Sequence, residues 1–345
     1  VANTPPTTPS NVTGVTPAGQ PGNQATPAGT TTSSSPETGK PTAVDVTNET
    51  LTATPAGSAG APPSAGSSAG STPAGGVEPL ASSTSTAEVR TLMQQAEQKQ
   101  KSNDLLGART LYSRALQSGK ASSNDEQTLR DRLQTINDDL VFSSKIYPGD
   151  TMVEEYAVKP SDALIRIAKN RELATDWRLI QRVNRMSDPG KLRVGQKLKL
   201  VKGPFHAVVD KSDYRLDLFH GSPDAPEDWT FIRSFKVGLG AGNSTPTGDF
   251  IIRKNSKLVD PHWVNPQTGE KFDKSDPKNP IGEYWLGFQG VGKSAAIEGY
   301  GLHGTIDPDS IGKQKSMGCV RLADEDIKLI YEVLVEQIST VKVKD

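Results

Sequence analysis

The chain has 345 residues and nearly balanced charge, with 39 Lys and Arg against 40 Asp and Glu and a formal net charge of −1 at pH 7. This balance gives no electrostatic reason to expect a nucleic-acid partner. The single cysteine excludes an internal disulfide framework, a multi-cysteine zinc site and a CxxC redox pair. We expect neither a metal nor a cofactor. The length allows about two or three domains, and no run of about 18 apolar residues is present that would span a membrane.

Residues 1–85 are rich in Thr, Pro, Ala, Gly and Ser. The tetrapeptide TPAG occurs four times in them, starting at Thr16, Thr26, Thr54 and Thr72. Such a segment cannot bury enough apolar surface to offset its chain entropy. We therefore expect a disordered tether without a catalytic role.

Residues 86–140 carry apolar side chains at helical spacing, and we predict a helical hairpin. Residues 94–119 resemble one tetratricopeptide-like helical pair, and Ser123 or Asn124 could cap the helix that follows. One such pair cannot bury its own apolar face. It should pack on neighbouring elements or dock a protein partner, and a simple spacer is the alternative.

Residues 153–202 predict a strand, two short helices and a closing strand. Ser161 or Asp162 could cap the first helix. The second helix is expected over residues 177–184, and the closing strand over residues 197–201.

This order of elements resembles a LysM domain. The matching landmarks are Tyr156-x-Val-Lys-Pro, Ile167-Ala168, Asn184 and Leu192-Arg-Val-Gly-Gln-x-Leu. LysM domains bind glycans that contain N-acetylglucosamine, in a groove between the first strand–helix loop and the second helix. The resemblance therefore implies a glycan site at Ser161, Asp162 and Asn184. However, Ser161 and Ala163 stand where the family more often has Gly and Thr, so a degenerate, purely structural module is the alternative.

From residue 205 onward the apolar period changes to two, which is typical of strands. Gly and Pro clusters separate the expected strands, at residues 207–210, 215–219, 230–237 and 249–252. A helix is expected from Asp324 to Ile338, and a last strand from Val341 to Val343. Residues 205–345 thus predict a mostly-β domain that is long enough for its own core.

The residues around the cysteine allow nucleophilic chemistry. A free thiol has a pKa of about 8.5, and a nearby histidine such as His303 can take the proton of Cys319. Gly318 permits a tight turn that would aim backbone N–H groups at one point, as an oxyanion requires. Gly304 permits close backbone approach, and Arg321 could bind a carboxylate or lower the pKa of the thiol. A buried, inert cysteine is the competing interpretation, and the spacing alone does not choose.

The motif around Cys319 resembles the signature of the L,D-transpeptidase catalytic domain, HGT…SxGC[IV]R. It reads His303-Gly-Thr and then Ser316-Met-Gly-Cys-Val-Arg-Leu. Further matching stretches are Arg215-Leu-Asp-Leu-Phe-His-Gly, Phe235-Lys-Val-Gly-Leu-Gly, Thr245-Pro-Thr-Gly-Asp-Phe and Glu283-Tyr-Trp-Leu-Gly-Phe. The resemblance implies a β-sandwich-like domain with a C-terminal helix, so that the whole chain is a multidomain protein.

The same resemblance implies a cysteine acyltransferase acting on peptidoglycan stem peptides. Cys319 would attack the third stem residue of a tetrapeptide donor, and an amine acceptor would then take the acyl group. His303 carries over as the base, oriented by a backbone carbonyl. The N–H groups of Gly318 and Cys319 carry over as oxyanion donors, and Ser316 and Arg321 as supports of the loop.

Further residues are expected at the cleft. Tyr284 and Trp285 lie on the strand that borders it in the family. The insertion of residues 255–282 is rich in Pro, Asn, Asp and Lys, and we expect it to be a lid or cleft-edge loop that brings Trp263 to the cleft.

Met317 stands where many family members have a second histidine. His303 is therefore the one histidine expected beside Cys319. The other three are interpreted as surface or loop residues: His206, His220 and His262.

The leading hypothesis is an L,D-transpeptidase that joins third residues of stem peptides and that the LysM module holds on glycan. An L,D-carboxypeptidase and an enzyme that attaches proteins to peptidoglycan are alternatives with the same nucleophile. A non-catalytic wall-binding scaffold is the alternative of another class. The chain starts at Val1, and we expect a protein of the cell envelope, periplasmic or otherwise extracytoplasmic, after removal of an N-terminal signal or anchor.

Overall fold

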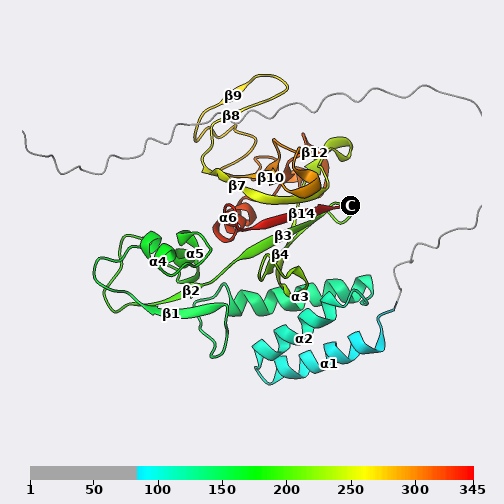
Figure 1. The fold of residues 1–345 in the computed structure, drawn as a ribbon, viewed down its shortest axis with the longest axis vertical. Coiled ribbons are helices and arrows are strands. Elements are labelled where there is room, and N and C mark those ends of the chain that lie inside the picture. The colour runs from blue at the N-terminus through cyan, green and yellow to red at the C-terminus, as the bar shows by residue number, and fades with distance from the viewer. Residues whose placement is uncertain (1–83) are drawn as a thin grey trace, which may run out of the picture. The chain divides into compact units, whose positions relative to one another are not determined.

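The computed structural model of the chain describes residues 84–345 (Figure 1). The predicted tether over residues 1–85 lies outside the described residues except at its end. There Ser85 is buried; its hydroxyl donates to the Asp125 carboxylate at 2.5 Å and accepts from the Ser122 N–H at 2.7 Å. At Ser85 the structure therefore departs from the predicted tether.

Residues 86–140 form three helices where the sequence predicted a hairpin. They are α1 (Ala87–Lys101), α2 (Leu105–Gln117) and α3 (Ser123–Leu140). The third helix is capped by Ser122, whose hydroxyl accepts from the Asp125 N–H at 3.2 Å, so the predicted caps Ser123 and Asn124 are wrong. A third helix is physically required, because α1 and α2 alone would leave an apolar face in water.

A βααβ module follows, as the sequence predicts. It consists of β1 (Val153–Ala157), α4 (Leu164–Asn170), α5 (Trp177–Val183) and β2 (Lys197–Val201). The two strands pair antiparallel, with Val153 opposite Val201. The module has its own apolar cluster, formed by Val158, Leu164, Ile167, Leu173, Ile180, Leu198 and Leu200.

Lys199 ties this module to the end of α3. Its side chain is almost fully buried, and its ammonium donates to the carbonyls of Leu140 at 2.6 Å, Ser143 at 2.9 Å and Lys145 at 2.7 Å. A cation at a helix C-terminus satisfies carbonyls that the helix itself leaves unpaired. Burial lowers the pKa of Lys199 to about 8, against the field of nearby carboxylates.

The start of α4 departs from the sequence prediction. The N-cap position is Ala163, which offers no side-chain hydrogen bond. Asp162 instead accepts from the Lys159 N–H and from the Tyr156 hydroxyl, both at 2.8 Å. Ser161 has φ of 67°, a left-handed conformation that favours glycine, which explains why glycine is more usual there. The predicted cap at Ser161 or Asp162 is therefore wrong.

The C-terminal domain is mostly β, as the sequence predicts. Its strands are β3 (Phe205–Asp210), β4 (Arg215–His220), β5 (Thr230–Lys236), β6 (Leu239–Gly240), β7 (Gly248–Val259), β8 (Trp263–Val264), β9 (Lys271–Phe272), β10 (Tyr284–Gly290), β11 (Gly301–His303), β12 (Gln314–Ser316), β13 (Val320–Arg321) and β14 (Thr340–Lys344). Eight of them form one mixed sheet in the order β13-β11-β10-β7-β14-β3-β4-β5. The expected sandwich-like layering is thus made by a single sheet.

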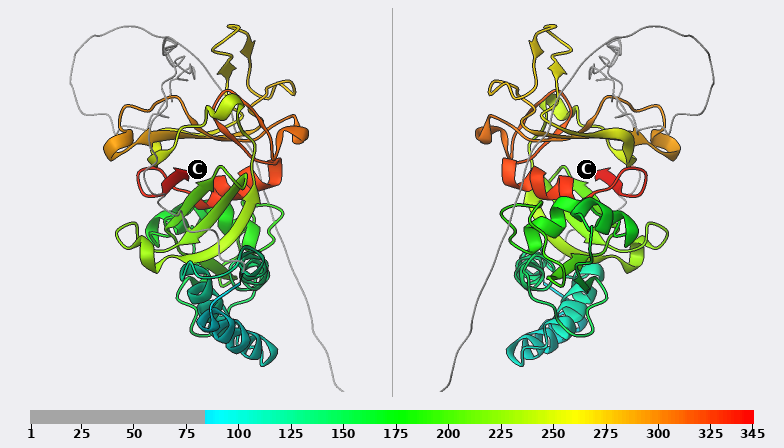
Figure 2. Two further views of the ribbon diagram at one scale, coloured as in Figure 1. Left: turned by 90° about the vertical axis from the view of Figure 1, so that its right-hand side faces the viewer. Right: turned by 90° about the vertical axis from the view of Figure 1, so that its left-hand side faces the viewer.

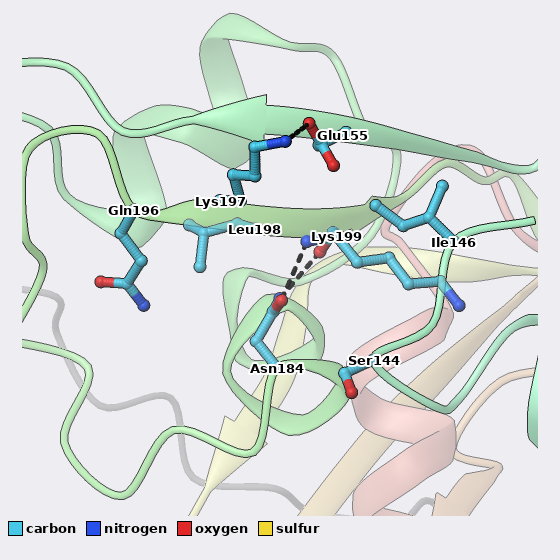
Figure 3. A pocket seen from close by; sticks show the side chains of 8 residues that line it. All are labelled: Ser144, Ile146, Glu155, Asn184, Gln196, Lys197, Leu198 and Lys199. Carbon is cyan, nitrogen blue, oxygen red and sulfur yellow. Dashed lines mark hydrogen bonds and ion pairs between the residues drawn. The ribbon is translucent and has the colours of Figure 1, made fainter.

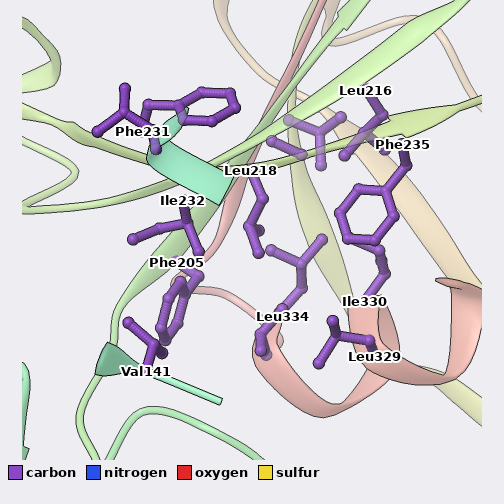
Figure 4. Close-up of a cluster of buried hydrophobic side chains, with 14 of the residues drawn as sticks. Val141, Phe205, Leu216, Leu218, Phe231, Ile232, Phe235, Leu329, Ile330 and Leu334 are labelled. Atoms are coloured by element: carbon purple, nitrogen blue, oxygen red, sulfur yellow. The ribbon is translucent and has the colours of Figure 1, made fainter. Parts of the chain in front are cut away.

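The sheet curls around one helix, α6 (Asp324–Val333). Figure 2 shows α6 between the strands near the two ends of the sheet. Leu329, Ile330 and Leu334 face Leu216 and Phe235 in the core (Figure 4). Full burial of one such side chain contributes about 1.5–3 kcal/mol, so α6 holds the two ends of the curled sheet together.

The helix ends five residues earlier than predicted, at Val333 instead of Ile338. Leu334 is extended, with φ of −85° and ψ of 134°. The Lys257 ammonium donates to the carbonyls of Tyr331 at 2.6 Å and Leu334 at 2.7 Å. This tertiary cap satisfies the last carbonyls of α6, and because it lies on β7 the local sequence does not reveal it.

Helix α3 packs on the sheet and so joins the helical region to the C-terminal domain. The Asn137 amide donates to the carbonyls of Phe231 at 2.9 Å and Ile232 at 3.1 Å on β5.

Among residues 84–345, no helix is both long enough and apolar enough to cross a membrane.

Because Ala163 is an N-cap without a capping side chain, we expect Ala163→Thr to stabilise α4 by about 1 kcal/mol. The measurement is the free energy of unfolding of the full chain in urea. Ala163→Val is the matched control, since it has the shape of Thr without the hydroxyl oxygen. Equal effects of the two substitutions would contradict the capping argument.

Candidate active site

Pairing of two short strands brings the expected base and nucleophile together. Strand β11 runs parallel to β13, with Leu302 opposite Val320 and His303 opposite Arg321. Cys319 precedes β13 by one residue. Because side chains alternate between the faces of a sheet, Cys319, Arg321 and His303 share one face.

His303 is held by a backbone carbonyl. The imidazole is 4% exposed, and its Nδ1 lies 2.6 Å from the Gly304 oxygen. Since a carbonyl only accepts, Nδ1 carries the proton and Nε2 keeps a lone pair that can take a proton from a thiol. Burial lowers the pKa of His303 to about 4, and the charge of Arg321 adds to this effect.

Cys319 is partly exposed and packs at the edge of an apolar cluster. Its Sγ lies 3.9 Å from the Gly299 oxygen. Burial raises the pKa of this thiol to about 11. With His303 also neutral, the resting site holds a thiol and an imidazole at neutral pH, and proton transfer must accompany attack.

Ser316 organises the turn before Cys319. Its hydroxyl donates to the Cys319 carbonyl at 2.6 Å and accepts from the Gly318 N–H at 3.1 Å. Gly318 has φ of 128°, and a Cβ there would lie 2.5 Å from the Tyr300 ring, so only glycine fits. The Gly318 N–H is thus occupied by Ser316 and is not available as the predicted oxyanion donor. The Cys319 N–H is the one of the pair that the turn leaves for that role.

Arg321 supplies positive charge on the same face as Cys319. Among the described residues, its buried Nε has no hydrogen-bond partner. Burial lowers the pKa of its guanidinium, against the field of Asp307, yet an arginine remains charged at any ordinary pH. It is therefore placed to bind a carboxylate.

Trp285 and Tyr284 point to opposite faces of β10. Trp285 is opposite His303 in the β10–β11 pair, and the two rings stack with centroids 5.9 Å apart. A Cβ at Gly301 would lie 3.0 Å from this indole, so the indole covers that strand. Tyr284 instead meets the Tyr331 ring of α6, with centroids 5.1 Å apart. The predicted place of Tyr284 at the cleft is wrong, because strand alternation turns it to the core.

Comparison with family models identifies two domains. Residues 204–343 match the model of the L,D-transpeptidase catalytic domain, and residues 156–201 match that of the LysM domain. The chain therefore carries a LysM domain followed by an L,D-transpeptidase catalytic domain.

Curated relatives bear the same family name. The YkuD protein of Bacillus licheniformis, named as an L,D-transpeptidase, is 27% identical over 50% of this chain and 88% of its own length. The YkuD protein of Bacillus subtilis is 31% identical over 30% of this chain and 62% of its own. The ErfK/SrfK protein of Escherichia coli is 29% identical over 36% of this chain and 39% of its own. The chain thus spans less than two thirds of the length of the Bacillus subtilis and Escherichia coli proteins.

Similar solved structures include an L,D-transpeptidase from Mycobacterium smegmatis. It is 14% identical, with a TM-score of 0.31 over 44% of this chain and 65% of that one. L,D-transpeptidase 3 from Mycobacterium tuberculosis is 12% identical, with a TM-score of 0.30 over 60% of this chain and 100% of that one.

The insertion in the L,D-transpeptidase domain forms an apolar wall beside Cys319. Its two strands β8 and β9 pair as a hairpin, and Trp263 meets Phe272 with ring centroids 5.7 Å apart. Trp263, Phe272, Ile281 and Trp285 form one cluster, against which Leu258 and Cys319 pack. The wall limits the water around Cys319 and raises its pKa, as described above.

The other histidines of the L,D-transpeptidase domain lie elsewhere. His206 is fully buried and stacks on Trp229 with centroids 4.3 Å apart, so its interpretation as a surface residue is wrong. His220 lies on β4, where its Nε2 contacts the Lys202 oxygen at 3.1 Å, so it too is no loop residue. His262 lies in a loop with its Nδ1 3.4 Å from the Asp273 carboxylate.

The LysM residues expected to bind glycan have different hydrogen-bond partners within the fold. Asn184 uses its amide within the fold: Nδ2 donates to the Ile180 and Lys199 carbonyls, and Oδ1 accepts from the Lys199 N–H, each at 2.8 Å. It lies in a polar cavity of about 440 Å³ (Figure 3). The glycan-binding role of Asn184 stays a prediction. Ser161 and Asp162 lie in the first loop, where Asp162 is engaged by Tyr156 and Lys159.

Sequence reasoning missed Tyr300, whose ring packs against Gly318. The signal was the Gly299-Tyr-Gly triplet at the start of β11, where an aromatic residue stands between two glycines. Among residues 84–345, no group of His, Cys, Asp and Glu side chains could hold a metal ion.

The raised pKa of Cys319 and the lowered pKa of His303 predict a resting pair without charge. Without substrate, the rate of alkylation of Cys319 by iodoacetamide should keep rising with pH toward about 11, because only the thiolate reacts. Cys319 is the one cysteine in the chain, so intact mass reports it alone. A rate that is already constant below about pH 7 would indicate a resting thiolate–imidazolium pair and would contradict the prediction.

Proposed function

We propose that Cys319 is the nucleophile of acyl transfer on peptidoglycan stem peptides, with His303 as its base. The observation that carries the proposal is the parallel register of β11 and β13. It puts a buried imidazole, whose Nδ1 is held by the Gly304 carbonyl, on the face of the sheet that carries the only thiol. The LysM and L,D-transpeptidase domains imply peptidoglycan as the substrate and action at the cell wall.

In the first half-reaction, the Cys319 sulfur attacks the carbonyl carbon of the third stem residue. His303 Nε2 accepts the thiol proton, so no free thiolate has to form in the apolar surroundings. The Cys319 N–H donates to the developing oxyanion. His303 then returns the proton to the amine of the leaving D-alanine, and a thioester remains on Cys319.

In the second half-reaction, the side-chain amine of another stem attacks the thioester. His303 accepts a proton from this amine and returns it to the sulfur as the thioester bond breaks. The product is a cross-link between two third residues. Water in place of the amine would release a tripeptide, and the apolar wall of Trp263, Phe272 and Ile281 favours the amine by limiting water.

Two further residues assist the pair in this proposal. Arg321, with its unpartnered Nε, binds a carboxylate of the stem peptide. Trp285 stacks on His303 and limits the positions that the imidazole can take. Ser316 and Gly318 support the turn through the bonds that Ser316 makes to Gly318 and Cys319. Residues 153–202 and 205–345 are, in the same proposal, the glycan-directed and the catalytic domain of an enzyme that works outside the cytoplasm.

We expect Cys319→Ala to abolish turnover of a muropeptide that carries a tetrapeptide stem, because no other thiol is present. The measurement is mass spectrometry of the products, in which a dimer means transpeptidation and a tripeptide alone means hydrolysis. Met317→Leu is the matched control in the same turn, because Met317 is 40% exposed and its side chain takes no part in the reaction. Full activity of Cys319→Ala would disprove the nucleophile assignment.

A solved relative is described as L,D-transpeptidase LdtMt1 in complex with imipenem. We expect a carbapenem to acylate Cys319 of this chain and to raise the intact mass by one drug molecule. Cys319→Ala should show no increase. If the wild-type chain forms no adduct and no muropeptide product, the non-catalytic scaffold is the better description.

A further inference from the structure

Helix α5 of the LysM domain contacts helix α6 of the catalytic domain. Arg182 of α5 forms a two-pronged ion pair with Glu332 of α6, with Nε–Oε2 at 2.5 Å and Nη2–Oε1 at 2.9 Å. The Asp176 N–H donates to the Glu332 carbonyl at 2.8 Å. Both the side chain and the backbone of one α6 residue are therefore bound by the LysM domain.

Glu332 depends on this contact. It is 2% exposed, and burial raises the pKa of its carboxyl while Arg182 opposes the rise. A buried carboxylate without a partner is strongly destabilising, whereas a fork-shaped guanidinium satisfies both oxygens. The catalytic domain thus contains a charge that the LysM domain neutralises.

A second contact lies next to the first. The Arg178 guanidinium of α5 lies 5.5 Å from the centre of the Tyr331 ring. That ring also receives the Lys257 ammonium at 4.3 Å. On its other side it meets the Tyr284 ring at 5.1 Å. Tyr331 therefore links α5 to strand β10 of the catalytic sheet.

The same helix reaches the backbone that holds His303. A Cβ at Gly304 would lie 3.3 Å from both Asp324 Oδ1 and Ile327 Cγ2 of α6. The Gly304 N–H donates to the Tyr284 carbonyl at 3.3 Å, and the Gly304 carbonyl accepts from His303 at 2.6 Å. Gly304, whose carbonyl fixes the imidazole, thus lies between α6 and β10, the two elements that Tyr331 joins.

We propose that Arg182 is a positioning residue: by binding Glu332 it holds α6 against Gly304 and so keeps His303 in place for proton transfer with Cys319. The LysM domain then sets the reactivity of the catalytic site as well as directing the enzyme to glycan. This proposal rests on the assignment of His303 and Cys319 in the proposed function. Because coupling between sites needs a direct test, the substitutions below are arranged as a cycle.

The experiment uses the full chain with Arg182→Ala, Glu332→Gln and the double variant, and measures iodoacetamide alkylation of Cys319 against pH. We expect Arg182→Ala to lower the melting temperature by several degrees and to move the alkylation midpoint down toward that of an exposed thiol, near about 8.5. The muropeptide kcat should fall about tenfold with little change in KM, as for a loss felt only in the transition state. Arg182→Lys keeps the charge and should restore part of each effect.

Arg171→Ala is the matched control. Arg171 forms a similar fork with Glu154, at 2.9 and 3.0 Å, but within the LysM domain and about half exposed. We expect no change in the alkylation midpoint or in kcat. In the double variant the effects of Arg182→Ala and Glu332→Gln should be less than additive, since both remove one interaction.

If Arg182→Ala lowers the melting temperature but leaves the midpoint and kcat as in the wild type, the pair is only structural and the proposal is overturned. If Arg182→Ala does not fold, Glu332→Gln and Arg182→Lys decide by the same two readouts. Failure of the proposed function gives a different result, because the wild-type chain would then yield no muropeptide product while the alkylation midpoints still test the positioning role.

Discussion

The parallel pairing of β11 with β13 is the constraint on which the site depends. Two strands of three and two residues bring together groups that are 16 positions apart, because His303 lies opposite Arg321 and Cys319 precedes Arg321 by two. The turn before β13 needs Ser316 on its inside and glycine at 318, where the Tyr300 ring leaves no room for a side chain. Sheet register thus fixes the chemistry more than any single side-chain contact does.

Burial shifts the pKa values of both members of the proposed reacting pair, Cys319 and His303. It raises the pKa of the Cys319 thiol to about 11 and lowers that of the His303 imidazole to about 4, so charge separation is unfavourable until a substrate carbonyl is present to accept electrons. The apolar cluster of the insertion maintains this state. Helix α6 supports the site from the opposite face of the sheet, and charged residues from other elements, Lys257 and Arg182, bind near its C-terminal end.

The sequence predicts the elements that local patterns define. The βααβ order and the period-two strands follow from spacing, and the fold confirms them. The interpretation of the His303–Cys319 motif rests on its resemblance to a family signature, because spacing alone left a buried, inert cysteine open. The family models match the two domains that the resemblances implied. Two of the predictions that the structure corrects depend on contacts between residues distant in the sequence. The helix after Cys319 stops at Val333 because Lys257 of β7 caps it. His206 is buried because both faces of its strand are covered. The occupied Gly318 N–H depends on turn geometry, which no periodicity encodes.

The proposed mechanism requires that an acyl group is carried by Cys319. The most direct measurement is to mix the chain with a tetrapeptide stem without an acceptor, stop the reaction in acid, and map the modified peptide by tandem mass spectrometry. We expect a stem tripeptide, linked as a thioester, on the peptide that contains Cys319, with one D-alanine released per acyl group. Release of D-alanine with the acyl group on any other residue, or with Cys319 unmodified at every reaction time, would contradict it.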